Sequence, residues 1–285
     1  MKVFTLIRDR WHPLHRARQW RWFQRLLYEW DPMVTAKIPH FQKPVYVRLF
    51  AHASLLLAQE GLEEGVRQTF TAWMTSTDGR KGFWDVGANI GLFSFTYGSV
   101  HPDASLISFE PDHRNLQCLR RTMSVWNLPS HRLVPAAVSD YTGQASFKID
   151  RLSGATGTLM EADRTFNERH YAAKTRTEEV NVVRLDDFYD PKAPPGLVKI
   201  DVEGAELAVL HGARQLLSEA APVLLFESFG REQECRSLVA PHNYSLFDAD
   251  RLSSSSTKTT NFLALNVEKV APDLIFGFRE LGYPM

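Results

Sequence analysis

The fold is decided by one stretch of sequence, Gly82-Phe83-Trp84-Asp85-Val86-Gly87-Ala88-Asn89-Ile90-Gly91. It opens with an apolar run that carries one acid, Asp85, and then places Gly87, Asn89 and Gly91 at every second position. The apolar segment 92–97 follows, so the order predicts a buried strand, a tight turn and the first turn of a helix. Glycines in such a turn allow positive φ and let a ligand approach the backbone. The N–H groups at the helix start can bind a negatively charged group.

The spacing of this turn argues against two common ligand classes. A dinucleotide-binding fingerprint needs glycines at positions 87, 89 and 92, where this chain has Gly87, Asn89 and Leu92. A P-loop ends in Gly-Lys-Ser/Thr, which this turn lacks. What remains is Asp85-x-Gly87-x-Asn89-x-Gly91, which resembles the first motif of class I S-adenosylmethionine-dependent methyltransferases. A strand-to-helix turn without a ligand is the alternative.

The composition is that of a globular protein. The chain has 285 residues, of which 44% are hydrophobic, enough for a substantial core. Lys+Arg and Asp+Glu balance at 33 each, so no net positive field indicates nucleic acid as a partner. Cys118 and Cys235 lie far apart, in predicted helices, and lack metal-ligand spacing. The two cysteines are therefore expected to be reduced thiols. The sequence also shows no signal peptide and no apolar run of about 20 residues, so a cytoplasmic protein is predicted.

Residues 1–59 form a predicted N-terminal extension that is basic and aromatic, ahead of a main domain at 60–285. Within it, Trp20, Phe23, Leu27 and Trp30 recur at helical spacing among arginines. Tryptophan beside arginine on an amphipathic helix is typical of a membrane interface, so residues 11–30 are a candidate for peripheral membrane contact. The alternative is an aromatic stripe buried on the domain or on a second subunit, as in a homo-oligomer. A strand is predicted at 45–50.

The main domain alternates predicted helices and strands. Helices are expected at 62–76, 90–100 and 112–126, the last with Asp112 as N-cap, and after Gly204. Strands are expected at 105–110, 132–138, 197–201, 221–227, 244–248 and 261–266, with 253–256 as a loop. This alternation predicts an α/β fold, Rossmann-like, with a mostly parallel sheet and helices on both faces.

The segment 140–196 interrupts that alternation. Alternating residues at 145–149 and 180–185 predict a β-hairpin. The polar stretch between them predicts a mobile loop, which could serve as a substrate lid or could be a flexible excursion without function.

A second acid supports a nucleoside ligand. Glu110 ends the predicted strand 105–110, 23 residues after Gly87. In nucleoside-binding α/β folds, an acid at this place accepts hydrogen bonds from the ribose hydroxyls. Ala137 and Val138 follow where an adenine ring would lie, and Glu60 could reach the ligand from the start of the 62–76 helix. Surface polarity explains Glu60 equally well.

The residues together resemble the FkbM-type methyltransferases over about 60–266. The resemblance is carried by Asp85-x-Gly87-x-Asn89-x-Gly91, by Phe109-Glu110-Pro111 with Asn115, and above all by Ile200-Asp201-Val202-Glu203-Gly204-Ala205-Glu206. It implies a seven-strand class I fold and methyl transfer from S-adenosylmethionine, leaving S-adenosylhomocysteine, usually to a hydroxyl of a sugar or polyketide. The cofactor-binding residues expected on this basis are Glu60, Asp85, Gly87, Ala88, Asn89, Gly91, Glu110, Pro111, Asn115, Ala137, Val138 and Asp201. Where the family commonly has Arg or Lys, this chain has His211, which therefore receives no catalytic role.

The acids Asp85, Glu110, Asp201 and Glu227 each end a predicted strand and should gather at one sheet edge. A hydroxyl is a poor nucleophile, so a general base should assist its attack on the methyl group. Asp201 is the first candidate, with Glu203 and Glu227 as helpers or substrate binders. The alternative for Asp201 is a structural cap of the helix after Gly204, and Glu206 is expected only to complement the start of that helix.

The resemblance favours an O-methyltransferase that acts on a glycan or glycolipid precursor, and three alternatives to it follow. Asp201, Glu227 and Asn261 would form an all-oxygen Mg²⁺ site if the fold brought them together. A nucleic-acid methyltransferase is disfavoured because base-amino methylating enzymes resemble one another in an Asn/Asp-Pro-Pro-Tyr loop, and this chain has Asp201-Val202-Glu203-Gly204 there. A non-catalytic nucleotide-binding or membrane-binding module would keep the turn and lose the acids, whereas this chain keeps both.

Overall fold

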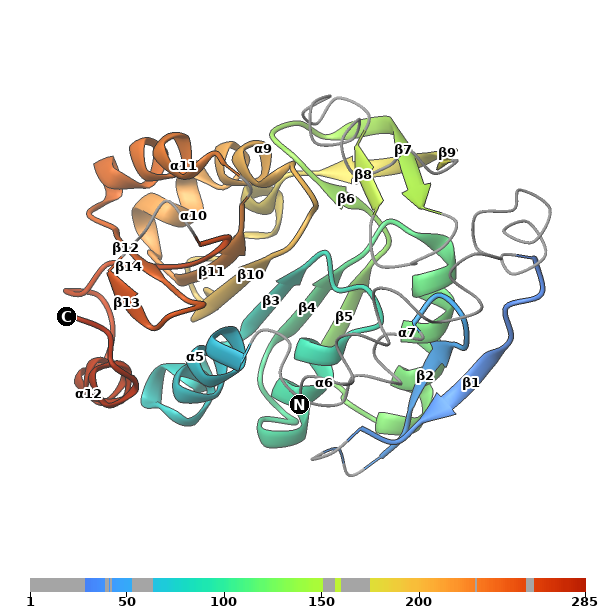
Figure 1. The fold of residues 1–285 in the computed structure, drawn as a ribbon, viewed down its shortest axis with the longest axis horizontal. Coiled ribbons are helices and arrows are strands. Elements are labelled where there is room, and N and C mark those ends of the chain that lie inside the picture. The colour runs from blue at the N-terminus through green and yellow to red at the C-terminus, as the bar shows by residue number, and fades with distance from the viewer. Residues whose placement is uncertain are drawn as a thin grey trace, which may run out of the picture.

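A computed structural model describes residues 29–38, 41, 43–52, 64–150, 157–159, 175–228, 230–254 and 259–285. Within these residues the central sheet has the strand order β13-β12-β14-β11-β10-β3-β4-β5 (Figure 1). Its strands are β3 (Phe83–Val86), β4 (Leu106–Phe109), β5 (His131–Val134), β10 (Leu197–Ile200), β11 (Val223–Glu227), β12 (Ser245–Asp248), β13 (Ser253–Ser254) and β14 (Asn261–Leu265). The run from β11 to β5 is parallel, and the pairs β11–β14, β14–β12 and β12–β13 are antiparallel. The prediction of a mostly parallel α/β sheet is confirmed.

The strand count differs from the seven that the resemblance implies. Among the described residues the central sheet has eight strands, because Ser253 and Ser254, expected in a loop, pair with Asp248 and Phe247 at its edge. The strand order places β4 and β5 on one side of β3, and β10 and β11 on the other. In parallel sheets a ligand crevice opens at such a reversal, at the carboxyl ends of the strands.

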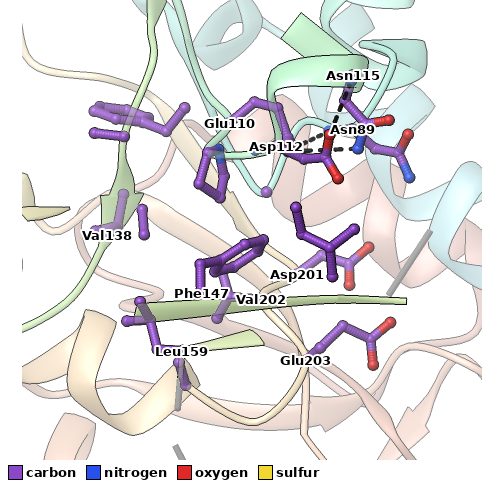
Figure 2. A pocket seen from close by; sticks show the side chains of 17 residues that line it. Asn89, Glu110, Asp112, Asn115, Val138, Phe147, Leu159, Asp201, Val202 and Glu203 are labelled. Atoms are coloured by element: carbon purple, nitrogen blue, oxygen red, sulfur yellow. Dashed lines mark hydrogen bonds between the residues drawn. The ribbon is translucent and has the colours of Figure 1, made fainter. Parts of the chain in front are cut away.

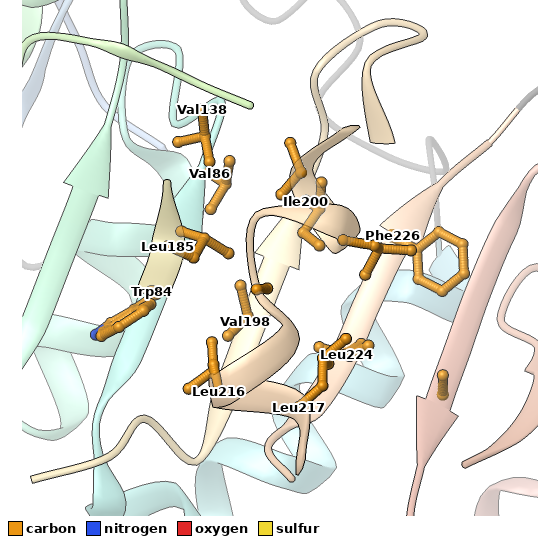
Figure 3. Close-up of a cluster of buried hydrophobic side chains, with 14 of the residues drawn as sticks. Trp84, Val86, Val138, Leu185, Val198, Ile200, Leu216, Leu217, Leu224 and Phe226 are labelled. Atoms are coloured by element: carbon orange, nitrogen blue, oxygen red, sulfur yellow. The ribbon is translucent and has the colours of Figure 1, made fainter. Parts of the chain in front are cut away.

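Helices cover both faces of the sheet, as predicted. They are α5 (Glu64–Thr75), α6 (Leu92–Val100), α7 (His113–Trp126), α9 (Glu206–His211), α10 (Arg214–Glu219), α11 (Glu232–Val239) and α12 (Pro272–Leu281). Successive residues of β3 point to opposite faces. Trp84 therefore belongs to the buried cluster that includes Leu216 and Leu217 of α10 (Figure 3). Phe83 belongs to the cluster on the other face, with Phe70 of α5 and Phe278 of α12. The predicted N-cap Asp112 is confirmed, since its carboxylate accepts from the N–H groups of Arg114 and Asn115.

Two predicted elements are divided in the structure. The expected strand 132–138 is broken at Pro135, which lacks the N–H needed to continue a ladder, so β5 ends at Val134 and β6 (Ala137–Val138) joins a different sheet. The expected helix after Gly204 becomes α9 and α10. The start of α10 is fixed from outside, because the Asp186 carboxylate accepts from the N–H groups of Gln215 and Leu216.

A second sheet, in the order β6-β9-β7-β8, stands beside the carboxyl ends of the central strands (Figure 1). The predicted hairpin is confirmed by β7 (Gly143–Asp150), which pairs antiparallel with β9 (Thr175–Val183). Strand β8 (Gly157–Leu159), which the sequence did not predict, pairs with β7. The remainder of the expected lid, 151–156 and 160–174, lies outside the described residues.

The N-terminal part of the described chain is a hairpin of β1 (Met33–Ala36) and β2 (Val45–Arg48). The strand predicted at 45–50 is thus confirmed as far as Arg48, whereas β1 was not predicted. The hairpin packs against α7 through the buried Val45 and Val47, and the Tyr46 N–H donates to the Thr122 hydroxyl at 2.9 Å. The candidate membrane segment lies outside the described residues up to position 28. In the part of the chain that the structure describes, every helix is too short or too polar to span a bilayer.

Candidate functional site

A pocket lies at the crevice where the strand order reverses, between the central sheet and the second sheet (Figure 2). Its walls come from the segments that follow β3, β4, β5 and β10, and from β7 and β8. The lining residues are Gly87, Asn89, Phe109, Glu110, Pro111, Asp112, Asn115, Ala136, Ala137, Val138, Phe147, Ile149, Leu159, Asp201, Val202, Glu203 and Ala205. Polar groups gather on one side of this pocket and apolar side chains on the other, a division that suits a nucleoside.

The glycine-rich turn is shaped by close packing between chain segments. The N–H groups of Gly87 and Ala88 both donate to the carbonyl oxygen of Phe109, at 3.0 Å each. A Cβ on Gly87 would lie 1.9 Å from the carbonyl oxygen of Asp201, and φ there is +77°. Glycine at this position therefore allows the turn after β3 to touch the end of β10. Gly87 and Asn89 line the pocket, whereas Ala88 and Gly91 do not.

Glu110 is the central polar group of the pocket. Its carboxylate accepts from the N–H groups of Asn89 and Asp112, both at 2.8 Å, and from the side-chain amide of Asn115 at 3.4 Å (Figure 2). Burial, reinforced by the nearby Asp112 carboxylate, raises the pKa of Glu110 to about 8. Of the expected cofactor residues, the structure brings Gly87, Asn89, Glu110, Pro111, Asn115, Ala137, Val138 and Asp201 to this pocket.

Asp85 lies behind the turn, buried beneath α6, and does not line the pocket. Its Oδ2 accepts from the Ser94 N–H at 3.1 Å and from the Ser94 hydroxyl at 2.6 Å. Its Oδ1 has no hydrogen-bond partner among the described residues. Burial raises the pKa of Asp85, and the neighbouring Lys199 ammonium opposes that rise. Asp85, which was expected among the cofactor-binding residues, thus lies outside the lining of the pocket.

The acids after β10 lie in the pocket wall. Asp201 and Glu203 both line it (Figure 2). Asp201 Oδ2 lies 2.9 Å from the ammonium of Lys199. Glu203 has a left-handed backbone, with φ of 54°. The Gly204 N–H at the start of α9 donates to Glu206, which matches the helix-start role expected for that acid. Burial raises the pKa of Glu206 to about 7.

Glu227 is placed differently. It is the last residue of β11, opposite Asn261 of β14, and it does not line the pocket. Asn261 donates to the Asp250 carboxylate at 2.9 Å. Among the described residues there is no group of three His, Cys, Asp or Glu side chains that could hold a metal ion, so the Mg²⁺ alternative receives no support. Glu60 lies outside the described residues.

The part of the apolar pocket wall that comes from β7 and β8 was not predicted from the sequence. Phe147 and Ile149 of β7, together with Leu159 of β8, form a buried cluster that faces the turn after β5 (Figure 2). The alternation of apolar residues at 145–149 could have shown that these side chains share one face of a strand. It could not show that this face meets the pocket, because that depends on how the second sheet docks.

Comparisons with known proteins show what this chain is similar to. The family model described as "Methyltransferase FkbM domain" matches residues 85–256. "Methyltransferase 1" of Beauveria bassiana (strain ARSEF 2860) is 28% identical over 141 residues, covering 45% of this chain and 56% of the relative. "2-O-methyltransferase NoeI" of Sinorhizobium fredii (strain NBRC 101917 / NGR234) is 27% identical over 143 residues, covering 47% and 58%.

The chain thus spans little more than half the length of these relatives. A solved structure of methyltransferase FkbM from Methylobacillus flagellatus KT has a TM-score of 0.45 and 19% identity, covering 75% of this chain and 48% of the other. The family model accounts for more than half of this chain, and its match includes the turn after β3, Glu110 and the segment after β10. The chain belongs to the FkbM methyltransferase domain family.

Proposed function

We propose that the protein binds S-adenosylmethionine in the pocket and transfers its methyl group to a hydroxyl of a sugar, glycan or glycolipid precursor. The observation that carries the proposal is the buried Glu110 carboxylate on the pocket wall, beside the turn after β3. An acid at this place accepts hydrogen bonds from ribose hydroxyls. The printed names of two relatives, "2-O-methyltransferase NoeI" and "31-O-demethyl-FK506 methyltransferase FkbM" of Streptomyces tacrolimicus, support a hydroxyl as the acceptor.

The pocket residues divide between the parts of the cofactor. Glu110 would hold the ribose, and the apolar side chains of Val138, Phe147 and Leu159 would cover the adenine ring. Asn115 donates to Glu110, which keeps that carboxylate oriented. The bound cofactor would supply an electrophilic methyl group on a positively charged sulfur, which the carboxylates of Asp201 and Glu203 would stabilise electrostatically.

Asp201 is the proposed general base. It lines the pocket, and the buried ammonium of Lys199 holds one of its oxygens at 2.9 Å, which leaves the other carboxylate oxygen to accept the proton of the acceptor hydroxyl. General-base assistance of this kind contributes about 10²–10⁴-fold to a rate. Glu203, on the same wall, would bind the acceptor. Glu227 receives no role because it lies outside the lining of the pocket.

The test is calorimetric titration of the purified chain with S-adenosylhomocysteine, followed by the same titration of Glu110→Ala. We expect micromolar binding that weakens tenfold or more in the variant, a loss of about 1.4 kcal/mol. A folded wild-type protein that binds no S-adenosylhomocysteine would overturn the proposal.

We further infer that residues 11–30, with tryptophans among arginines, hold the protein at a membrane surface where a glycolipid precursor would be found. Sedimentation of the full chain with anionic vesicles checks this inference, and a protein that stays in the supernatant contradicts it.

A further inference from the structure

His52 connects the N-terminal hairpin to the pocket. It lies in the turn that follows β2, and it is buried, with 5% of its surface exposed. Its Nε2 lies 3.2 Å from the side-chain oxygen of Asn89, a residue of the turn after β3. Asn115 also interacts with the imidazole. His52 therefore contacts two residues that line the pocket, although it is not itself part of the lining.

The hydrogen bonds of His52 fix its tautomer. The Arg48 N–H donates to Nδ1 at 2.9 Å, so Nδ1 is the acceptor nitrogen and Nε2 carries the hydrogen. The ring consequently donates from Nε2 to the Asn89 oxygen. Burial lowers the pKa of His52, which keeps the ring in this neutral form.

The turn that carries His52 is held by one buried carboxylate. Asp31 accepts from the N–H groups of Phe50 at 2.8 Å and Ala51 at 3.1 Å. The same carboxylate forms an ion pair with Arg114, in the first turn of α7, at 3.1 Å. The open end of the hairpin, where Asp31 precedes β1 and the turn follows β2, is thus attached to the helix that follows Glu110. This attachment sets the position of His52.

The contact matters because Asn89 has an unusual backbone. Its φ is 53°, in the left-handed region that non-glycine residues rarely adopt. In this conformation the Asn89 N–H donates to Glu110 at 2.8 Å. Fixing the side chain of Asn89 from behind favours the backbone conformation that directs this N–H toward the carboxylate.

We propose that His52 is a positioning residue of the cofactor site, which acts by holding Asn89 in place beside Glu110. The N-terminal segment 29–52 therefore completes the site. This inference rests on the proposed function, since the ligand whose affinity reports it is S-adenosylhomocysteine.

Two substitutions separate the two nitrogens of the ring. His52→Gln keeps a donor at the position of Nε2 and loses the acceptor for the Arg48 N–H. His52→Asn keeps an acceptor at the position of Nδ1 and cannot reach Asn89. If His52 positions Asn89, His52→Gln should bind S-adenosylhomocysteine within about threefold of the wild type, and His52→Asn should bind about five- to tenfold more weakly, the effect of one hydrogen bond.

Calorimetry gives the affinities, and thermal unfolding without ligand gives the stability of each variant. Lys43→Ala is the matched control, because Lys43 anchors the same hairpin to the Trp126 carbonyl of α7 at 2.9 Å and does not line the pocket. It should lower the unfolding temperature and leave the affinity unchanged. The inference is overturned if His52→Asn binds as well as the wild type while His52→Gln binds weakly, or if Lys43→Ala weakens binding as much as His52→Asn. A wild type that binds no S-adenosylhomocysteine overturns the proposed function instead.

Discussion

Glu110 has a carboxyl group that is almost fully buried and yet borders a pocket. Two backbone N–H groups and one amide donate to it, but they do not offset the loss of water, and its pKa rises to about 8. At neutral pH the carboxyl is therefore largely protonated before any ligand binds. Ribose hydroxyls would donate to the ionised form, so ligand binding and proton release should be linked.

The sign of this linkage predicts the pH dependence of binding. Below the raised pKa the ionised fraction increases about tenfold for each pH unit, so the affinity for S-adenosylhomocysteine should rise by about fifty-fold between pH 6 and pH 8 and level off above pH 8. Calorimetry in buffers of different ionisation enthalpy should show a proton released at pH 7. Glu110→Gln, which cannot ionise, should bind more weakly and show a flat profile. An equal pH dependence in both proteins would contradict this assignment.

At the scale of elements, a row of polar residues crosses one face of the central sheet. Lys199 of β10 is paired in register with Asp85 of β3, which is paired with Ser108 of β4. Ser108 also contacts the ring of His131 in β5 at 2.7 Å, and burial lowers the pKa of that histidine to about 4. The row lies under α6. The ammonium of Lys199 contributes a positive charge to the row: it forms an ion pair with Asp201 and opposes the rise in the pKa of Asp85.

Replacement of Lys199 by methionine should therefore be costly. The substitution removes the ammonium that opposes the raised pKa of the buried Asp85 and that forms the ion pair with Asp201. Removal of one partner of a buried pair typically costs about 3–5 kcal/mol. Because the Asp201 side chain is 34% exposed and Asp85 can take up a proton, we expect a loss at the low end of that range. Urea unfolding measures it.

The double variant Asp85→Asn/Lys199→Met provides the control. If the two groups are coupled, the double variant should lose less stability than the sum of the two single variants. Additive losses would show that the two residues act independently.

Part of the predicted N-terminal extension, from Asp31 to the turn after β2, belongs to the folded unit of the molecule. Asp31 contacts α7 through the ion pair with Arg114, and β2 packs against α7 through the buried Val45 and Val47. Strand β1 pairs with β2. A truncation at residue 40 would remove Asp31 and β1, and with them the support of His52. A truncation of residues 1–28 leaves these contacts in place.

We expect the 1–28 truncation to keep the unfolding temperature and the affinity for S-adenosylhomocysteine of the full chain, and to lose binding to anionic vesicles. Thermal unfolding, calorimetry and vesicle sedimentation measure the three properties. Vesicle binding that survives the truncation would place the membrane contact elsewhere. A drop in ligand affinity would show that residues 1–28 also contribute to the site.

Much of the site could be predicted from short stretches of sequence. Gly87 and Asn89 are a turn signal, and Glu110 ends a strand before a proline, so their chemistry and their sheet edge followed from residue order alone. Parallel strands bring their carboxyl ends together, which is why Asp201 was expected beside them and lies in the same pocket. Buried strands and amphipathic helices have short-range periods, so α5, α6, α7 and the hairpin of β7 and β9 were also predictable.

Tertiary structure decided what depends on contacts between distant segments. Ser253 and Ser254 carry no strand signal and become a strand only because β12 offers a free edge. Glu110 and Asp201 directly follow β4 and β10, whereas Asp85 lies inside β3 and Glu227 is the last residue of β11. Neither Asp85 nor Glu227 lines the pocket. His52 and Asn89 are 37 positions apart in the sequence. They meet only because the hairpin docks against α7. Sequence determined the strand ends and their chemistry because those are local; packing determined which side chains meet.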